Sequence, residues 1–235
     1  MDNAARVRQR VLALFLPIAA LLYISGEAVS PKGTDQVVTT AATAFKVLPI
    51  AARHSTQLYL ASWLVLLGLG ALAVSYAAIA TLVRDRGSAL ATIAALVGGI
   101  GAFCGAIVNV IVYPGLAAAA TAHVSRDAAA KVLTTGFNSE FGHFFVYVYF
   151  ASEFLAPLLM AIALWRSRSV PRWLAALFFA GLEVAELMSS MGPIVVLYML
   201  PFAAAMVLLA ARIWQATVPD SRSCSLESAV SVPAG

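Results

Sequence analysis

The amino-acid sequence predicts an all-α protein, a polytopic membrane bundle of about six transmembrane helices. Of its 235 residues, 62% are hydrophobic and only 11% are charged, whereas soluble domains carry about 25% charged residues. The mean hydropathy is +0.90. Six apolar runs are each near the length of ~20 residues that a helix needs to cross a bilayer. These observations exclude a soluble protein.

The six runs divide the chain into one transmembrane domain, residues 1–218, and a polar tail, residues 219–235. Because the tail is rich in Ser, Val and Ala without periodicity, we expect it to be disordered. The predicted spans are Val11–Val29, Leu58–Val83, Ala89–Tyr113, His143–Trp165, Trp173–Ser190 and Pro193–Trp214.

The basic residues predict the orientation of the bundle. With the N-terminus inside, ten Lys and Arg residues fall on the inner side and five on the outer side, as the positive-inside rule requires. We therefore expect both termini to be cytoplasmic and the protein to reside in the cytoplasmic membrane of a bacterium. The excess positive charge then reports topology, and no nucleic-acid partner is expected.

Two long connections lie on the expected outer side. Ser30–Gln57 and Pro114–Gly142 are each nearly thirty residues long, well beyond ordinary loop lengths. The first contains an apolar stretch with a single Lys46 that suits a short interfacial helix. The second has helical propensity, Pro114 and Gly115 as expected breakers of the third span, and Ser125 as a candidate N-cap. We expect these connections to form a lid or a wall of a site.

Three glutamates inside the predicted spans are the main candidate catalytic residues: Glu153, Glu183 and Glu186. An ionised carboxylate at membrane depth costs at least ~2.5 kcal/mol, so these side chains should face the bundle interior. Glu183 and Glu186 are three residues apart and share a helix face with Ser190. We expect at least one glutamate to be protonated and able to donate that proton, and a Glu183–Glu186 pair facing one cavity to titrate as a unit. The alternative is that they only form hydrogen bonds between helices.

The fourth span carries the candidate substrate-binding residues. At 100° per residue, His143, Tyr147 and Phe150 share one face, and Tyr149 shares another with Glu153. Aromatic faces stabilise a cation by ~0.5–2 kcal/mol each, although such a stripe is also typical of plain core. Polar residues near the outer ends of other spans complete the set of candidate substrate-binding residues: Glu27 and Asn109.

The sequence contains little that indicates a metal or a cofactor. It has two cysteines, no CxxC motif and no DDxxD-type cluster that binds diphosphate through Mg²⁺. A metal site built from Glu27, His54, Glu140 and His143 is conceivable but not expected. The glycine-rich run Gly98–Gly105 follows no strand, so it predicts a helix-packing surface and not a phosphate loop. We expect neither a metal nor a cofactor.

In size, number of spans and placement of buried acids, the chain resembles the membrane-bound terpene cyclases of meroterpenoid and indole-terpenoid pathways. The resemblance implies that intramembrane acidic residues start cyclisation by protonating an epoxide or an alkene. The fungal members of that family are usually drawn with seven spans, whereas six are predicted here. No motif aligns residue by residue, so no site position is carried over.

The leading hypothesis is therefore an integral-membrane cyclase of a lipophilic isoprenoid, with membrane lipid as its surroundings and the apolar inner half of the bundle receiving the polyene tail. The same glutamates are also consistent with a proton-coupled carrier or a small channel. Against a carrier, the chain lacks the internal repeat of many transporters. A third hypothesis is a non-catalytic assembly or immunity subunit, in which the glutamates are dispensable.

Overall fold

The computed structural model describes residues 3–34, 37–83, 86–187 and 194–217. These residues form eight helices: α1 Asn3–Val29, α2 Ala41–Arg53, α3 Ser55–Ala80, α4 Ser88–Thr121, α5 Arg126–Asn138, α6 Glu140–Ser167, α7 Arg172–Leu187 and α8 Val195–Ala216. The chain is an all-α membrane bundle, as the composition predicts. The expected tail, residues 219–235, lies outside the described residues.

Five of these helices, α1, α3, α4, α6 and α8, are long and apolar enough to cross a membrane. Each corresponds to one predicted span. The remaining span, Trp173–Ser190, corresponds to α7, which has 16 residues as described. At about 1.5 Å per residue it is about 24 Å long, shorter than the ~30 Å hydrocarbon core of a bilayer. Its predicted end, Ser190, lies outside the described residues.

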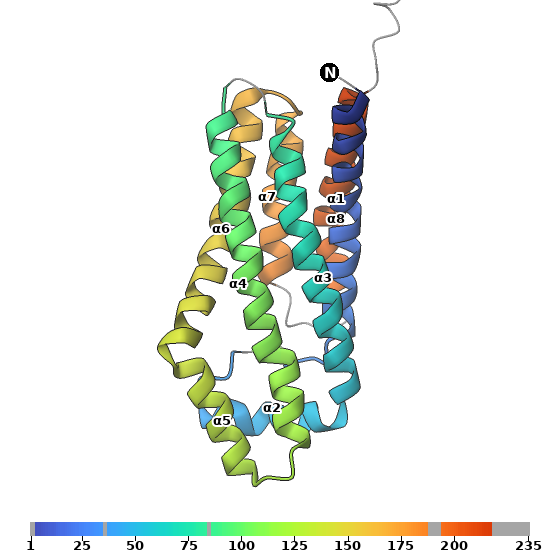
Figure 1. Cartoon of the computed structure of the whole chain (residues 1–235). Helices are drawn as coiled ribbons and strands as arrows, with labels where there is room; N and C mark the ends of the chain where they lie inside the picture. Colours follow the sequence, from blue (N-terminus) through green and yellow to red (C-terminus); the bar gives the residue numbers. More distant parts are fainter. Residues whose placement is uncertain (1–2, 35–36, 84–85, 188–193, 218–235) are drawn as a thin grey trace, which may run out of the picture.

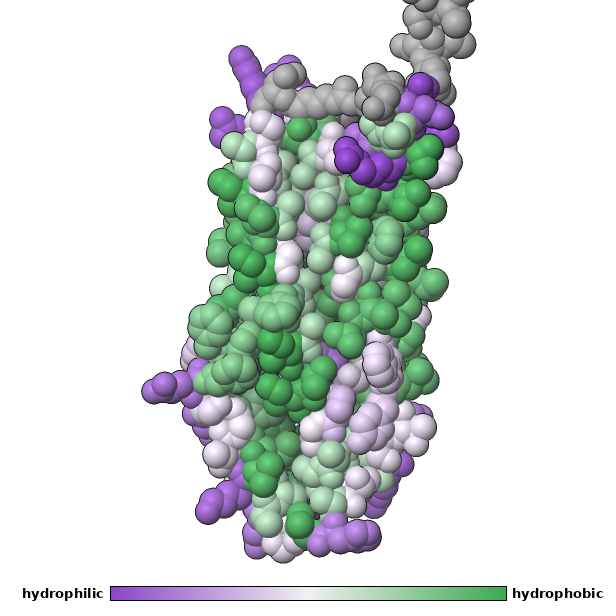
Figure 2. Space-filling view, in the orientation of Figure 1, coloured by the Kyte–Doolittle hydropathy of each residue, from purple (hydrophilic) through white to green (hydrophobic). Residues whose placement is uncertain are grey.

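The six long helices form a closed ring in the order α1, α3, α4, α6, α7, α8, with α8 packing back against α1. The N-terminus and the end of α8 lie at the same end of the bundle (Figure 1), where Arg10 Nε donates a hydrogen bond to Thr217 Oγ1 at 3.0 Å. On the face seen in Figure 2, a wide hydrophobic belt covers the middle of the bundle and hydrophilic residues gather at its two ends. This distribution is typical of a protein that spans a bilayer.

The short helices α2 and α5 cap the other end of the bundle. They pack against each other and against α4, and α2 lies across the bundle end (Figure 1). Both begin at a residue whose side chain accepts a hydrogen bond from the first turn, Thr40 for α2 and Ser125 for α5, so the predicted cap at Ser125 is confirmed. Asn138 Nδ2 donates to Thr39 O at 2.8 Å and thereby joins the two long connections.

The predicted end of the third span is wrong. α4 continues through Pro114 to Thr121, although proline removes one backbone hydrogen bond from a helix interior. The residues after Gly115, Leu116–Ala120, are one leucine and four alanines, which are among the strongest helix formers. The extra turns carry the chain beyond the belt and deliver α5 to the cap.

The predicted packing surface on α4 is confirmed, because its glycines allow close contacts with neighbouring helices. A Cβ atom on Gly98 would lie 2.5 Å from the Tyr76 ring, and one on Gly101 would lie 2.5 Å from Ser152 Cβ. Small residues let helix backbones approach closely inside a membrane, where packing replaces the hydrophobic effect as the driving force. Gly101 therefore sets the close contact between α4 and α6.

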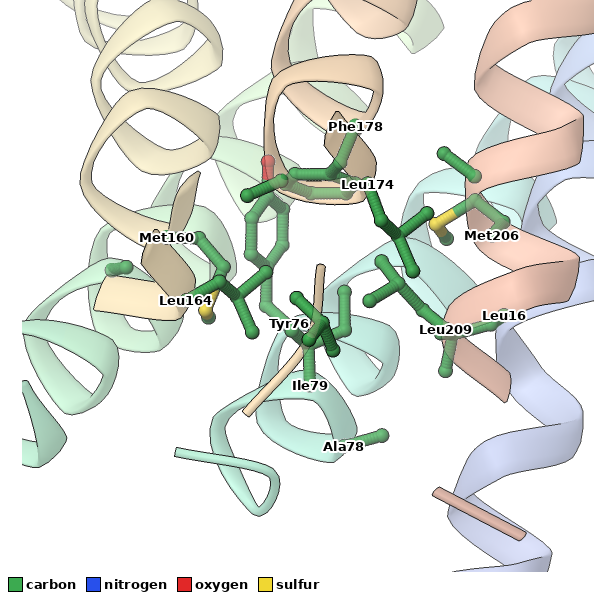
Figure 3. Close-up of a cluster of buried hydrophobic side chains, with 14 of the residues drawn as sticks. Leu16, Tyr76, Ala78, Ile79, Met160, Leu164, Leu174, Phe178, Met206 and Leu209 are labelled. Carbon is green, nitrogen blue, oxygen red and sulfur yellow. The ribbon is translucent and has the colours of Figure 1, made fainter. Parts of the chain in front are cut away.

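A tightly packed cluster fills the half of the bundle that holds the start of α1 and the end of α8 (Figure 3). Its largest members have at most 1% of their surface exposed and come from five helices: Leu16, Ile79, Met160, Leu164, Leu174, Phe178, Phe202, Met206 and Leu209. The expectation that this half receives a polyene tail is wrong, because its interior is occupied by side chains. Space for a ligand lies in the other half.

Candidate functional site

A cavity of about 300 Å³ lies in the capped half of the bundle. Five helices line it, α1, α3, α4, α6 and α7, together with Val37 from the connection before α2. Ligand pockets usually have volumes of about 300–1,000 Å³, so this one suits a compact group. Of the two long connections, the first contributes Val37 to the lining, and the prediction that both form a lid or a wall of a site stays a prediction.

Three glutamates from three different helices line this cavity: Glu27 of α1, Glu153 of α6 and Glu183 of α7. Glu27 has 5% of its surface exposed, while Glu153 and Glu183 are partly buried. The lining residues include no Arg, Lys or His. The carboxyl groups therefore border one shared space whose lining residues carry no basic side chain.

The structure thus brings Glu153 and Glu183 together, two of the three candidate catalytic residues. α7 includes the position of the third, Glu186, but its side chain lies outside the described residues, as does Ser190. The predicted alignment of Glu183, Glu186 and Ser190 towards one cavity therefore stays a prediction.

Among the candidate substrate-binding residues, Glu27, Asn109, Tyr149 and Phe150 line the cavity. His143 and Tyr147 do not line it, because they lie on the outward face of α6, where Tyr147 is 69% exposed. Their rings contact each other with centroids 5.9 Å apart. Of the two faces of the fourth span, the one with Tyr149 and Glu153 faces inwards.

A glycine on α4 determines which face of α6 turns inwards. A Cβ atom on Gly105 would lie 2.6 Å from the ring of Tyr149, so only glycine leaves room for this ring against α4. The ring then forms part of the cavity wall, with Glu153 one helical turn further along α6. The packing surface on α4 therefore forms part of the candidate site.

Gly105→Ala is expected to displace the Tyr149 ring and to destabilise the fold by about 1–3 kcal/mol, as overpacking does in cores. Gly99→Ala on the same helix is the matched control, because nothing lies within 4 Å of its added Cβ. Thermal unfolding of both variants in detergent measures the difference. Equal melting temperatures would show that the ring of Tyr149 is not held by this contact.

Two aromatic residues of the cavity were missed in the sequence. Tyr23 and Tyr113 are 4% and 5% exposed and line the cavity with Tyr149 and Phe150. Tyr23 lies one turn before Glu27 on α1, a spacing that could have revealed it. Tyr113 was hidden by the expected helix end at Pro114. The cavity thus combines carboxyl groups with several aromatic rings.

The cavity reaches the outer surface of the bundle beside α6. Phe150 lines the cavity and is nevertheless 52% exposed, and Phe154, one turn further, is 49% exposed. Phe154 contacts Phe179 of α7 edge to face, with centroids 5.8 Å apart. An apolar molecule in the hydrocarbon layer would therefore meet aromatic side chains at the edge of the cavity.

Asn109 is the buried amide of the site. It is 5% exposed, and its Oδ1 accepts a hydrogen bond from Ser62 Oγ of α3 at 2.6 Å. Its Nδ2 is buried and has no hydrogen-bond partner among the described residues.

The described residues contain no group of three or more His, Cys, Asp or Glu side chains close enough to hold a metal ion. His54 and Glu140, two members of the conceivable metal site, are exposed. The glutamates around the cavity are therefore spread over its wall and do not form a cluster with ligand spacing. Comparisons with protein-family models, with curated proteins and with solved structures found no match for this chain.

Proposed function

We propose that this cavity is the active site of an integral-membrane terpene cyclase, which protonates and cyclises a lipophilic isoprenoid without a metal or another cofactor. The observation that carries the proposal is the meeting of Glu27, Glu153 and Glu183 with aromatic rings in one cavity at membrane depth. A protonated carboxyl group in such a place is a general acid. The aromatic faces would stabilise the carbocation that follows.

In the proposed reaction, Glu153 donates its proton to a terminal alkene carbon or to an epoxide oxygen of the substrate. The resulting carbocation is attacked by the next double bond, so that a carbon–carbon bond forms and the ring closes. Glu183 accepts the proton that leaves the final cation. For an alkene substrate the product is an isomer, and the reaction needs neither an oxidant nor a reductant.

Glu153 is assigned as the donor because of its position. It lies one turn from Tyr149 on the same helix face, and it also borders a second, small space of about 20 Å³ that leads towards the packed cluster. The proton is therefore released next to an aromatic face that shields the new cation. Glu183, on the neighbouring helix α7, lines the same cavity and would receive the proton.

The size of the cavity determines how the substrate would bind. A volume of about 300 Å³ holds the reacting end of an isoprenoid, and the remaining chain would extend past the half-exposed Phe150 into the lipid. Substrate entry from the hydrocarbon layer fits a molecule that is insoluble in water. We further propose that the end that holds the start of α1 and the end of α8 faces the cytoplasm of a bacterium, since Arg6, Arg8 and Arg10 lie there.

The experiment uses membranes containing the protein and farnesyl- or geranylgeranyl-bearing substrates, with and without their epoxides, in H₂O and in D₂O. We expect a cyclic product that carries one non-exchangeable deuterium when an alkene is protonated. With an epoxide, the deuteron goes to oxygen and exchanges away during isolation. If none of these substrates gives a cyclic product, the proposal fails.

A proton-coupled carrier has less support, because the glutamates would need a path through the half of the bundle that the packed cluster fills. The test is flux of a solute into proteoliposomes. A flux that depends on a pH gradient and is abolished by Glu183→Gln would favour the carrier over the cyclase.

A further inference from the structure

We propose that Asn109, held by Ser62, is the anchor for an oxygen atom of the substrate, so that the site selects isoprenoids that carry a hydrogen-bond acceptor. The inference rests on the proposed function in one respect, that the cavity is a substrate site. The glutamates can supply a proton to the substrate, whereas the amide would fix where the substrate lies.

The first step concerns the direction of the amide. The contact between Ser62 Oγ and Asn109 Oδ1 is 2.6 Å long. This length is typical of an O–H donor on an oxygen acceptor and is shorter than usual contacts of an amide N–H. Because the serine holds the oxygen of the amide, the NH₂ group is the end that is left for another partner.

The second step concerns the unused donor. Asn109 Nδ2 is buried, belongs to a residue that lines the cavity, and has no hydrogen-bond partner among the described residues. Buried polar groups are nearly always hydrogen-bonded, and an exception calls for an explanation. A ligand oxygen placed at this wall would satisfy the donor.

The third step concerns the chemistry of the ligand. An amide NH₂ donates and cannot accept, so it recognises a carbonyl, ether, epoxide or hydroxyl oxygen. A pure hydrocarbon leaves the donor unsatisfied, and a site built around a hydrogen bond discriminates against the analogue that lacks it. Ser62 is then a positioning residue, since it acts through Asn109 and is not itself among the residues that line the cavity.

The test measures binding and not turnover, with farnesyl methyl ether and farnesene as probes. The ether oxygen accepts a hydrogen bond but has no hydrogen to donate. Its binding therefore cannot reflect a hydrogen bond from the probe to a carboxylate of the cavity. Full-length protein in nanodiscs is incubated with radiolabelled farnesyl methyl ether, and unlabelled ether and farnesene compete for the site. We expect the ether to bind about five- to tenfold more tightly than farnesene, the effect of one satisfied hydrogen bond.

Asn109→Leu is expected to reduce this preference to about onefold. Ser62→Ala should reduce it in part, because the amide is then free to rotate, and Ser62→Thr should restore it. Ser75→Ala is the matched control, since Ser75 is equally buried on α3 but donates to Ala71 O at 2.8 Å, away from the cavity.

A wild-type protein that binds both probes equally overturns the inference, as does a preference that survives Asn109→Leu in a folded variant. If Asn109→Leu does not fold, a preference that Ser62→Ala leaves undiminished overturns the inference instead. Failure here is distinct from failure of the proposed function. If the protein prefers the ether through Asn109 but forms no cyclic product, the role of Asn109 stands and the cyclase proposal fails. If it forms a cyclic product but does not prefer the ether, the cyclase proposal stands and the role of Asn109 fails.

Discussion

Glu153→Gln is expected to reduce turnover by about 10²- to 10⁴-fold, the usual contribution of a general acid. Glutamine keeps the size and the hydrogen-bonding capacity of a protonated carboxyl group but cannot give up a proton. Expression and melting temperature should therefore stay close to those of the wild type. The measurement is product formation per folded protein in membranes, together with thermal unfolding in detergent.

The other carboxyl groups are expected to contribute less. Glu183→Gln removes the proposed proton acceptor, a role that water entering the cavity can partly replace, so the loss should be smaller than for Glu153→Gln. Glu186→Gln is included because its position shares a helix face with Glu183. Glu140→Gln is the matched control, since Glu140 is on the same helix as Glu153 but exposed near the cap.

Normal activity in all three variants, Glu153→Gln, Glu183→Gln and Glu186→Gln, would contradict the catalytic role. The glutamates would then serve as hydrogen-bonding groups between helices. A non-catalytic subunit of a larger assembly would become the better description of the protein. Lysine in place of Glu153 should impair membrane insertion, because Lys at the centre of a helix costs about 2.5–3.5 kcal/mol.

Gly181→Ala is expected to destabilise the bundle by at least about 1–3 kcal/mol, as overpacking does in cores. The added Cβ would lie 2.7 Å from the backbone nitrogen of Phe202 and 2.9 Å from its Cα. Backbone atoms cannot move aside as a flexible side chain can, so α7 and α8 must separate. Thermal unfolding should show the loss directly.

The same substitution should also lower activity, because Glu183 lies two residues further along α7 and moves with the helix. Gly70→Ala on α3 is the control, since no atom lies within 4 Å of its added Cβ. An equal melting temperature for the two variants would mean that α7 and α8 are not in the close contact described here. A stable Gly181→Ala protein with reduced activity would still place α7 near the chemistry.

The sequence predicted the class of the fold and most of its helices because hydropathy records burial in lipid residue by residue. It could not predict that α7 packs between α6 and α8 in a closed ring, since the order of neighbours depends on contacts between distant residues. The end of α4 was misplaced because Pro114 is a breaker only on average. Here the alanines that follow it favour the helix more strongly.

The candidate site was predicted in its chemistry and only partly in its geometry. Glu153 and Glu183 could be selected because carboxyl groups in apolar spans are costly unless they face an interior. The inward face of α6 could not be selected, since both faces carry aromatic residues. The choice depends on the space that Gly105 leaves for the ring of Tyr149. These two residues are more than forty positions apart in the sequence, so no local pattern predicts their contact.

The packed cluster has a consequence for the energy metabolism of the cell. Acidic groups inside a membrane protein are hazardous when water reaches them from both sides, because protons then leak along the chain of carboxyl groups and dissipate the electrochemical gradient. Residues such as Leu16, Phe178 and Met206, none of which has any exposed surface, form an apolar insulator between the cavity and the other end of the bundle. We therefore expect proton exchange with the carboxyl groups to be confined to the capped half of the bundle. The protein can hold several ionisable groups in its interior without acting as an uncoupler.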